Sequence, residues 1–222
     1  RSEVRAVTAK QRIDKLLVDL GLAETRNRAQ ALVMSGVVLV DEKRVDKPSE
    51  KFTKTATIRL KGTSTELRYV GRGGLKLEAA LRHFGVDVVG LDCIDIGAST
   101  GGFTDCLLQH GAESVVCVDS GTNQLVWSLR DDPRVEVRER TNARNLKPSD
   151  FDNILDLAVM DVSFISVKKV IPAILPLLTA TGLMIVLIKP QFEVGRGEVG
   201  KGGIVRETEK HARVVSDINE FA

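Results

Sequence analysis

Residues Asp92 to Phe103 read DCIDIGASTGGF. The apolar, partly β-branched run stops at Gly97, three glycines fall within six positions, and Phe103 to Gln109 has the pattern of a helix. We therefore predict a strand, a tight turn and a helix N-terminus. Such a turn lets a ligand approach the backbone closely, because glycine has no Cβ and adopts φ values closed to other residues. The free amides of the new helix would then face that ligand.

A second predicted strand, Ser114 to Val118, ends at Asp119, about twenty residues after the glycine turn. A carboxylate at this offset reaches the ribose hydroxyls of a nucleotide-like ligand. Asp119 is therefore a candidate ribose ligand. The turn and Asp119 fit a dinucleotide and S-adenosylmethionine (AdoMet) equally, because both present an adenosine. A tight connection with Gly102 as a packing residue is the alternative that needs no ligand.

Three further strands are predicted downstream, over residues 134–138, 155–160 and 183–188. Residues 167–178 fit a helix in spite of Pro172 and Pro176. Strands that alternate with helices predict a parallel, doubly wound sheet and hence an α/β fold. Ligands of such sheets bind beyond the carboxyl ends of the strands. The residues that directly follow a predicted strand should therefore face one crevice: Gly97, Asp119, Asp161 and Lys189.

The segment before the central strand, residues 71–81, reads GRGGLKLEAAL. Its glycines permit a bend, and Leu75 begins the pattern of an amphipathic helix. Lys76 lies in the first turn of this helix, where the helix dipole disfavours a cation. That placement invites a functional explanation, with an ordinary surface lysine as the alternative.

The net charge of +2 hides an asymmetry between the two ends of the chain. Residues 1–76 carry 17 Lys and Arg against 9 Asp and Glu, whereas residues 77–222 carry 15 against 21. A basic N-terminal part on an acidic body indicates a polyanionic partner. A charged face that only contacts solvent is the alternative.

Two short helices are predicted in this basic part, one from Arg12 that ends at Gly21 and one over residues 25–35 with Thr25 as N-cap. Residues 37–48 fit a short hairpin. The second helix should bury its apolar face and project its polar side chains on the opposite side: Arg26, Arg28 and Gln30.

The N-terminal part resembles the alpha-L RNA-binding motif, first known from a ribosomal small-subunit protein. The matching segments are RIDKLL (12–17), RNRAQA (26–31), SGVVLV (35–40) and VDKP (45–48). The resemblance implies that basic residues of the two helices contact structured RNA, which agrees with the charge asymmetry. By position, the candidate phosphate contacts are Arg12, Lys15, Arg26, Arg28 and Lys47.

The remaining motifs are similar to those of the TlyA family, ribosomal RNA 2′-O-methyltransferases that are often described as haemolysins. These motifs are GGLKL (73–77), GASTGGFTD (97–105), DVSFIS (161–166), KPQFE (189–193) and GKGG (200–203). The resemblance implies a Rossmann-like, FtsJ-like methyltransferase sheet over residues 75–222, a linker over 67–74 and a small α+β RNA-binding domain over 1–66. It also implies AdoMet as cofactor and rRNA cytidine as acceptor. The cofactor-binding candidates are Gly97, Ala98, Ser99, Gly101, Gly102, Phe103, Asp119 and Asp161.

The family also implies a Lys-Asp-Lys-Glu catalytic set, of which Lys76, Asp161 and Lys189 match by motif. A ribose hydroxyl is a poor nucleophile until it loses its proton, and only a neutral lysine can accept that proton. We assign Lys189 as the base, Lys76 as the cation that orients the hydroxyl, and Asp161 as the carboxylate that positions the lysine; the two lysines could exchange roles. A structural ion pair is the alternative for such residues.

The glutamate of that set belongs to a strand near the C-terminus of the family and has no counterpart before Ala222. We therefore expect further residues, with two more strands of the sheet, beyond this point of the chain. An edge strand as apolar as residues 183–188 would otherwise stand bare.

Composition excludes several classes of protein. The three cysteines form no C-x-x-C pair, so we expect buried free thiols in a reducing, cytoplasmic compartment. The three histidines are scattered, so no metal site is indicated. No apolar run approaches the length that spans a bilayer. The sequence carries no signal for the oligomeric state, the target nucleotide or the ribosomal subunit.

Three other functions compete with an rRNA methyltransferase. A protein that binds AdoMet and RNA without catalysis is favoured by the absent glutamate. A pore-forming haemolysin would need spanning or lipid-facing segments, which the sequence lacks. A dehydrogenase that uses NAD would leave the basic N-terminal part without a role.

Overall fold

The computed structural model describes residues 10–23, 25–61, 68–195, 197–200 and 202–221. They fall into two compact units. The first contains residues up to Asp87 together with Ser99–His110 and Asn123–Val135, and the second contains Val88–Ala98, Gly111–Thr122 and Glu136 onwards. We describe each unit by itself.

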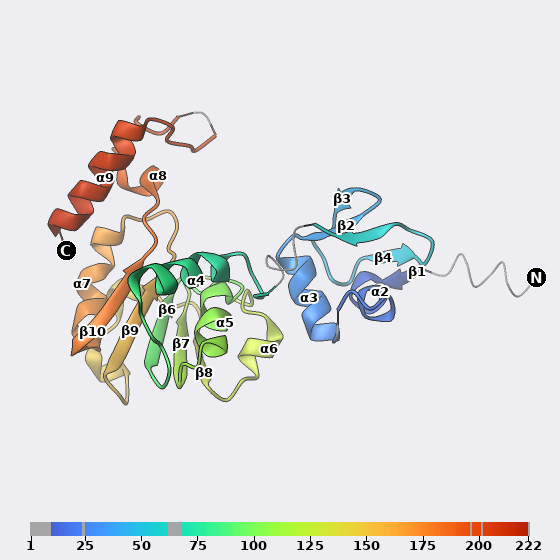
Figure 1. Ribbon diagram of the computed structural model, residues 1–222, viewed down its shortest axis with the longest axis horizontal. Helices are drawn as coiled ribbons and strands as arrows, with labels where there is room; N and C mark the ends of the chain where they lie inside the picture. The colour runs from blue at the N-terminus through green and yellow to red at the C-terminus, as the bar shows by residue number, and fades with distance from the viewer. Residues whose placement is uncertain (1–9, 24, 62–67, 196, 201, 222) are drawn as a thin grey trace, which may run out of the picture. The chain divides into compact units, whose positions relative to one another are not determined.

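The N-terminal part of the first unit has two helices and two small antiparallel sheets, β1-β4 and β3-β2-β5 (Figure 1). Ile13, Leu17, Val33 and Val38 are fully buried in its core. The elements are β1 (Lys10–Arg12), α2 (Ile13–Asp19), α3 (Arg26–Met34), β2 (Val38–Val40), β3 (Lys43–Arg44), β4 (Lys51–Thr53) and β5 (Ile58–Leu60).

Local signals in the sequence set the ends of these elements. The Thr25 hydroxyl accepts a hydrogen bond from Arg28 N at 3.2 Å, so Thr25 is the N-cap of α3 as predicted. Gly21 follows α2 with a φ of 69°. Asp41 and Glu42 have φ values of 48° and 64°, which joins β2 and β3 through the left-handed turn that suits the twist of a hairpin.

Three more helices complete the first unit: α4 (Gly73–Phe84), α5 (Gly102–Gln109) and α6 (Trp127–Arg130). Helix α4 begins two residues before the expected Leu75, inside the segment assigned as a linker. A Cβ on Gly102 would lie 3.1 Å from Gly74 N and 3.2 Å from Gly71 O. The N-termini of α4 and α5 therefore touch through glycines. Of the residues assigned to the linker, Leu67 lies outside the described residues.

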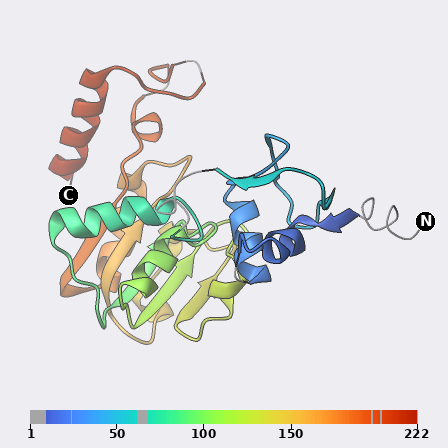
Figure 2. The same cartoon turned by 45° about the vertical axis from the view of Figure 1, so that its right-hand side comes forward.

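The second unit is built on a five-stranded sheet of order β10-β9-β6-β7-β8, which confirms the predicted α/β fold (Figures 1 and 2). The pairs β6-β7, β6-β9 and β9-β10 are parallel. This is the Rossmann-type order, and the chain changes direction across the sheet between β6 and β9. The strands are β6 (Asp92–Ile96), β7 (Ser114–Val118), β8 (Val135–Arg138), β9 (Leu155–Met160) and β10 (Leu178–Val186).

Both faces of the central strands are buried, as expected of a parallel sheet. Ile94 on one face of β6 and Cys93 on the other have no exposed surface. The core that contains Ile94 also takes in Ile174 of α7 (Ile171–Ile174) and Val214 of α9 (Thr208–Phe221). The short elements are the 3₁₀ helices η1 (Ala143–Asn145), η2 (Pro148–Asp150), η3 (Val167–Lys169) and η4 (Leu175–Leu177), and α8 (Pro190–Glu193).

Two predictions about this unit are wrong. The helix expected over residues 167–178 is broken into η3, α7 and η4, because Pro172 and Pro176 supply no N–H donor and exclude a continuous ladder. The last strand covers Leu178–Val186 rather than 183–188, with a register shift between Leu178 and Leu183. The first residues of β10 were not predicted as strand because several of them are polar, although they belong to the strand that pairs with β9.

The three cysteines are buried free thiols, as predicted. Burial raises the pKa of Cys93 and of Cys106 to about 12, so neither thiol is a nucleophile near neutral pH. Within the described ranges, no helix is long and apolar enough to cross a membrane.

Candidate active site at the strand ends

The carboxyl ends of β6, β7 and β9 lie level. Ile96 pairs with Val118 on one side and with Met160 on the other. Gly97 N donates to Val118 O at 2.8 Å, and Asp161 N donates to Ile96 O at 3.0 Å. The side chains that follow these strands therefore leave the same edge of the sheet, as the sequence predicted for Gly97, Asp119 and Asp161.

Gly97 and Asp161 meet where the strand order changes direction. Gly97 has a φ of 86°, and a Cβ there would lie 2.9 Å from the backbone oxygen of Asp161. Only glycine fits this position without strain. The backbones of β6 and β9 thus approach each other at the point where open α/β sheets bind ligands.

Lys189 forms an ion pair with Asp161. Its Nζ lies 2.5 Å from Asp161 Oδ1 and donates a hydrogen bond to Ser163 Oγ at 2.8 Å. Both side chains of the pair are 20% exposed, while the paired oxygen, Asp161 Oδ1, is itself buried. The structure thus brings together two of the three predicted catalytic residues, and it adds Ser163, which the sequence reasoning did not single out.

The loop after β9 carries an exposed aromatic side chain beside this pair. Phe164 is 91% exposed and has a φ of 65°, which is strained for a bulky residue. Its ring lies 5.2 Å from that of Phe192, centroid to centroid. The sequence reasoning did not single out this residue, because its motif is mostly apolar.

Asp119 lies at the end of β7 with a half-buried side chain. Its Oδ1 accepts from Gly121 N at 2.7 Å, and its backbone N donates to Arg138 O at 3.1 Å. The carboxylate is therefore oriented by its own loop. Together with Asp161 and the bare backbone of Gly97, it provides acceptors that fit the hydroxyl and ammonium groups of a nucleoside such as AdoMet.

The glycine turn before α5 is shaped by packing as well. A Cβ on Gly101 would lie 2.3 Å from Leu129 Cδ1, so this glycine makes room for the side chains around α6. Ser99 has a φ of 49° and donates from its hydroxyl to Gln124 Oε1 at 3.2 Å. Ala98 and Phe103 are buried. Phe103 therefore packs inside the protein rather than lining an open surface.

Lys76 lies in the first turn of α4, as predicted, and its side chain is exposed. This first turn is the part of α4 that contacts the N-terminus of α5 through Gly74 and Gly102. Lys76 thus follows, two residues later, the glycine that contacts the N-terminus of α5.

Two of the five predicted RNA contacts form an ion-pair cluster instead of standing free. Asp14 has no exposed surface, and its carboxylate accepts from Arg12 Nη2 at 2.8 Å, Gln30 Nε2 at 3.0 Å and Arg26 Nε at 3.2 Å. Burial alone would raise the pKa of Asp14, but these hydrogen bonds outweigh it and lower the pKa to about 2. Arg26 and Gln30, which were predicted to project from the side opposite the apolar face of α3, reach across to Asp14 of α2.

The other three predicted RNA contacts are open to solvent. Lys15 and Lys47 are exposed, and Arg28 is partly exposed. Asp14 was missed because a lone aspartate in a basic segment looks like a surface residue; the signal that could have found it is its place beside Ile13, on the buried side of an amphipathic helix.

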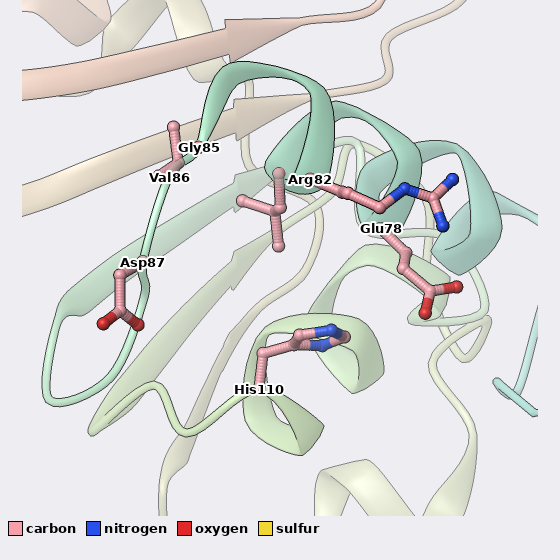
Figure 3. A pocket seen from close by; sticks show the side chains of 7 residues that line it. Glu78, Arg82, Gly85, Val86, Asp87 and His110 are labelled. Carbon is pink, nitrogen blue, oxygen red and sulfur yellow. The ribbon is translucent and has the colours of Figure 1, made fainter.

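A hollow of about 400 Å³ lies along the C-terminal half of α4 (Figure 3). Its charged side chains differ in sign and project from α4 and the loop after it, so they share no common ligand chemistry. The lining residues are Glu78, Leu81, Arg82, Gly85, Val86, Asp87 and His110.

Comparison with known families agrees with this geometry. Residues 69–221 match the FtsJ-like methyltransferase family, and residues 11–58 match the S4 domain. The chain is 50% identical to the candidate rRNA methyltransferase YqxC of Bacillus subtilis, over 96% of this chain and 75% of that protein. It is 46% identical to the 16S/23S rRNA (cytidine-2′-O)-methyltransferase TlyA of Mycobacterium tuberculosis, over 92% of this chain and 76% of that protein.

A solved structure of a candidate hemolysin from Streptococcus thermophilus is also similar. It matches with a TM-score of 0.72 and 48% identity, over 96% of this chain and 78% of that chain. The level strand ends, the Asp161–Lys189 pair and these matches lead to one assignment. The chain belongs to the FtsJ-like methyltransferase family, in the TlyA group that carries an S4 domain at its N-terminal end.

Proposed function

We propose that this protein transfers a methyl group from AdoMet to a ribose 2′-hydroxyl of ribosomal RNA, with cytidine as the acceptor nucleoside. The observation that carries the proposal is the Lys189–Asp161 pair at 2.5 Å, at the strand ends where the sheet changes direction. A proton acceptor and an orienting carboxylate are what a ribose hydroxyl needs to become a nucleophile.

Each residue has a distinct role in this proposal. AdoMet, when bound, supplies an electrophilic methyl group. Lys189 first loses the proton that its ion pair with Asp161 favours, and its neutral amine then takes the proton of the 2′-hydroxyl as the hydroxyl oxygen attacks. Asp161 and Ser163 hold the amine of Lys189 in place by the contacts described above. Lys76 orients the hydroxyl; the reverse assignment of the two lysines is tested below. The remaining rate acceleration comes from alignment of the hydroxyl oxygen with the methyl group of AdoMet.

The cofactor is bound by the turn and the strand ends in this proposal. Asp119 accepts hydrogen bonds from the ribose hydroxyls of AdoMet, and Asp161 borders its amino-acid part. Gly97, Ala98, Ser99, Gly101 and Gly102 let the cofactor lie close to the backbone. Because Phe103 is buried, it supports this turn from behind.

The RNA is bound at two places. Lys15, Arg28 and Lys47 contact phosphates from the S4 domain, whereas Arg12 and Arg26 keep the two helices together through Asp14. Phe164 offers the face of its ring to the base of the target nucleotide, since stacking on an aromatic side chain holds an unpaired base without regard to its identity. The domain boundaries proposed above, 1–66, 67–74 and 75–222, separate these two places.

Methyl transfer from radiolabelled AdoMet to an rRNA transcript tests the proposal. The wild-type chain should label the transcript, and RNase digestion should place the label on a 2′-O-methylated cytidine. The pH dependence of the single-turnover rate, measured for Lys189→Arg and Lys76→Arg, identifies the base: the variant of the base loses the rise of rate with pH.

Three results would favour the other functions. Binding of AdoMet and RNA without any transfer would indicate a binding protein. A calorimetric titration in which NAD binds and AdoMet does not would indicate a dehydrogenase. Dye release from liposomes at concentrations that saturate RNA binding would indicate a membrane-active haemolysin.

A further inference from the structure

Two segments are joined side by side at the strand ends: the loop of residues 161–167 after β9, and residues 189–193, which lead from β10 into α8. Three successive contacts along the two segments join them, and we number these contacts as levels. The first level is the Lys189 amine between Asp161 and Ser163, and the second is the contact between the rings of Phe164 and Phe192. The third level is the carboxylate of Glu193, which reaches Ser166 and Val167.

Both oxygens of Glu193 are used at this third level. Oε2 accepts from the Ser166 hydroxyl at 2.6 Å, and Oε1 accepts from Val167 N at 2.8 Å. Hydrogen bonds to an ionised carboxylate are short and strong. Ser166 Oγ in turn accepts from Lys168 N at 3.3 Å, so the serine hydroxyl caps η3 while its proton is directed at Glu193. The far end of the loop is thus fixed to the start of α8.

The near end of the loop carries strain. Phe164 lies between the two fixed ends with a φ of 65° and most of its ring in solvent. A bulky residue keeps such a backbone only when its surroundings restrain it. Release of Glu193 would let the loop relax, and Ser163, which precedes Phe164, would leave the Lys189 amine.

We propose that Glu193 is a positioning residue: its carboxylate fastens the loop of residues 161–167 and so holds Ser163 and Asp161 around the Lys189 amine. Glu193 touches no reacting atom and acts through Ser166 and Val167. The kinetic consequence rests on the function proposed above, whereas the geometric consequence for Lys189 does not.

Chemical labelling of Lys189 tests the geometry without any assay of activity. The full chain is pulsed with acetic anhydride, and acetylation of Lys189 is measured by mass spectrometry against the exposed Lys147 as internal standard. In Glu193→Ala, the freed amine should react about three- to tenfold faster, because it loses its hydrogen bond to Ser163.

Glu193→Gln is the conservative variant. Its amide oxygen accepts from Val167 N, and its NH₂ group donates to Ser166 Oγ, so both links persist. Labelling of Lys189 should stay at the wild-type rate. Glu198→Ala is the matched control, because Glu198 also accepts a backbone N–H, from Gly195 at 2.9 Å, and pairs with Arg213, but it has no link to the loop. This control should also match the wild type.

Methyl transfer by the same variants tests the kinetic consequence. The single-turnover rate of Glu193→Ala should fall about 10- to 100-fold, the range expected when a catalytic amine is displaced by about 1 Å. Glu193→Gln and Glu198→Ala should stay within about threefold of the wild type, and the Kd for AdoMet, measured by calorimetry, should be unchanged throughout.

Two results would overturn the proposal: wild-type labelling of Lys189 in Glu193→Ala, or equal changes in the alanine and glutamine variants. If the alanine variant does not fold, Ser166→Ala, which removes one of the two links, should raise the labelling about twofold to threefold; an unchanged rate there would overturn it equally. If the wild type transfers no methyl group, the proposed function fails, and the labelling still decides the role of Glu193.

Discussion

Asp14 and Asp161 are both carboxylates that pair with cations, and they differ in everything around them. Asp14 lies in the N-terminal part, has no exposed surface and takes hydrogen bonds from two arginines and a glutamine. Asp161 follows a strand end, is 20% exposed and pairs with Lys189. The carboxylate of the first cluster is buried beneath partly exposed arginines, whereas the carboxylate of the second is itself partly exposed.

This difference in burial distinguishes an ion pair that stabilises the fold from one that can take part in a reaction. A buried carboxylate with all its hydrogen bonds made holds its partners in place and has nothing left to offer a ligand. A pair that is 20% exposed keeps a lysine amine oriented and within reach of solvent, which is what proton transfer requires. The composition of a cluster does not tell these cases apart, but its accessibility and its place in the fold do.

The largest effect is expected at Lys189. Replacement by Ala should lower the rate of methyl transfer at least about 10³-fold, since it removes the group proposed to accept the proton. The melting temperature should hardly change, because partly exposed ion pairs contribute little to stability. Radiolabel transfer and differential scanning calorimetry on one preparation measure both quantities. Normal activity, or a strong loss of stability, would make this pair structural like Asp14.

The reverse result is expected at Asp14. Replacement by Asn removes the charge, and its NH₂ group faces donors that it cannot satisfy. The N-terminal part should lose about 2 kcal/mol of stability. Protection of the amides of α2 and α3 from hydrogen exchange should fall about 30-fold, while AdoMet binding stays normal. Unchanged protection would contradict the assignment of the cluster as structural.

Acid should act on the same cluster. The pKa of Asp14 is about 2 when folded, below its ordinary value of 3.8. Asp14 therefore contributes its stabilisation above about pH 4 and loses it as the pH falls toward 2, an effect of about 2 kcal/mol. The difference between wild type and Asp14→Asn in the urea midpoint of the N-terminal transition should shrink over this range. A constant difference would show that the charge of Asp14 is irrelevant.

The smallest effects are expected for single phosphate contacts. Lys15→Ala should weaken rRNA binding a few-fold and reduce the salt slope of the affinity by about one. Arg12→Ala should change the salt slope less, because this guanidinium is committed to Asp14, and should mainly lower the stability of α2. Fluorescence anisotropy with labelled rRNA fragments at several salt concentrations measures the slopes. Equal salt slopes for Lys15→Ala and Arg12→Ala would show that the ion pair of Arg12 with Asp14 does not keep it from contacting a phosphate.

Sequence reasoning succeeded where local pattern decides the structure. The strands β7 and β9 were predicted to the residue and the end of β6 correctly, since each is a short apolar run that ends at a glycine or an aspartate. Asp161 was found because motif and strand end coincide, whereas Lys189 was found by its motif and lies three residues after the end of β10. The S4 part was predicted from its resemblance to the alpha-L RNA-binding motif, in agreement with its charge.

It failed where the outcome depends on residues far away in the chain. Asp14 is buried because Arg26 and Gln30 arrive from another helix, which no local pattern records. Glu193 ends a short motif, and its partners Ser166 and Val167 lie on a different strand connection. The start of β10 was missed because its pairing with β9, rather than its own composition, makes it a strand.

Because the ends of β6, β7 and β9 lie level, the length of each strand determines where the residues that follow it lie. One residue inserted within β9 would advance Asp161 by about 3.3 Å and turn its side chain to the other face, whereas the same insertion after Lys147, in the connection before β9, would leave the pair with Lys189 in place. Changes of chain length among relatives should therefore be confined to the connections between strands. In the proposed function, the number of residues in each strand determines the distance between the ribose hydroxyl and AdoMet. The loops beyond the strands determine which RNA is bound.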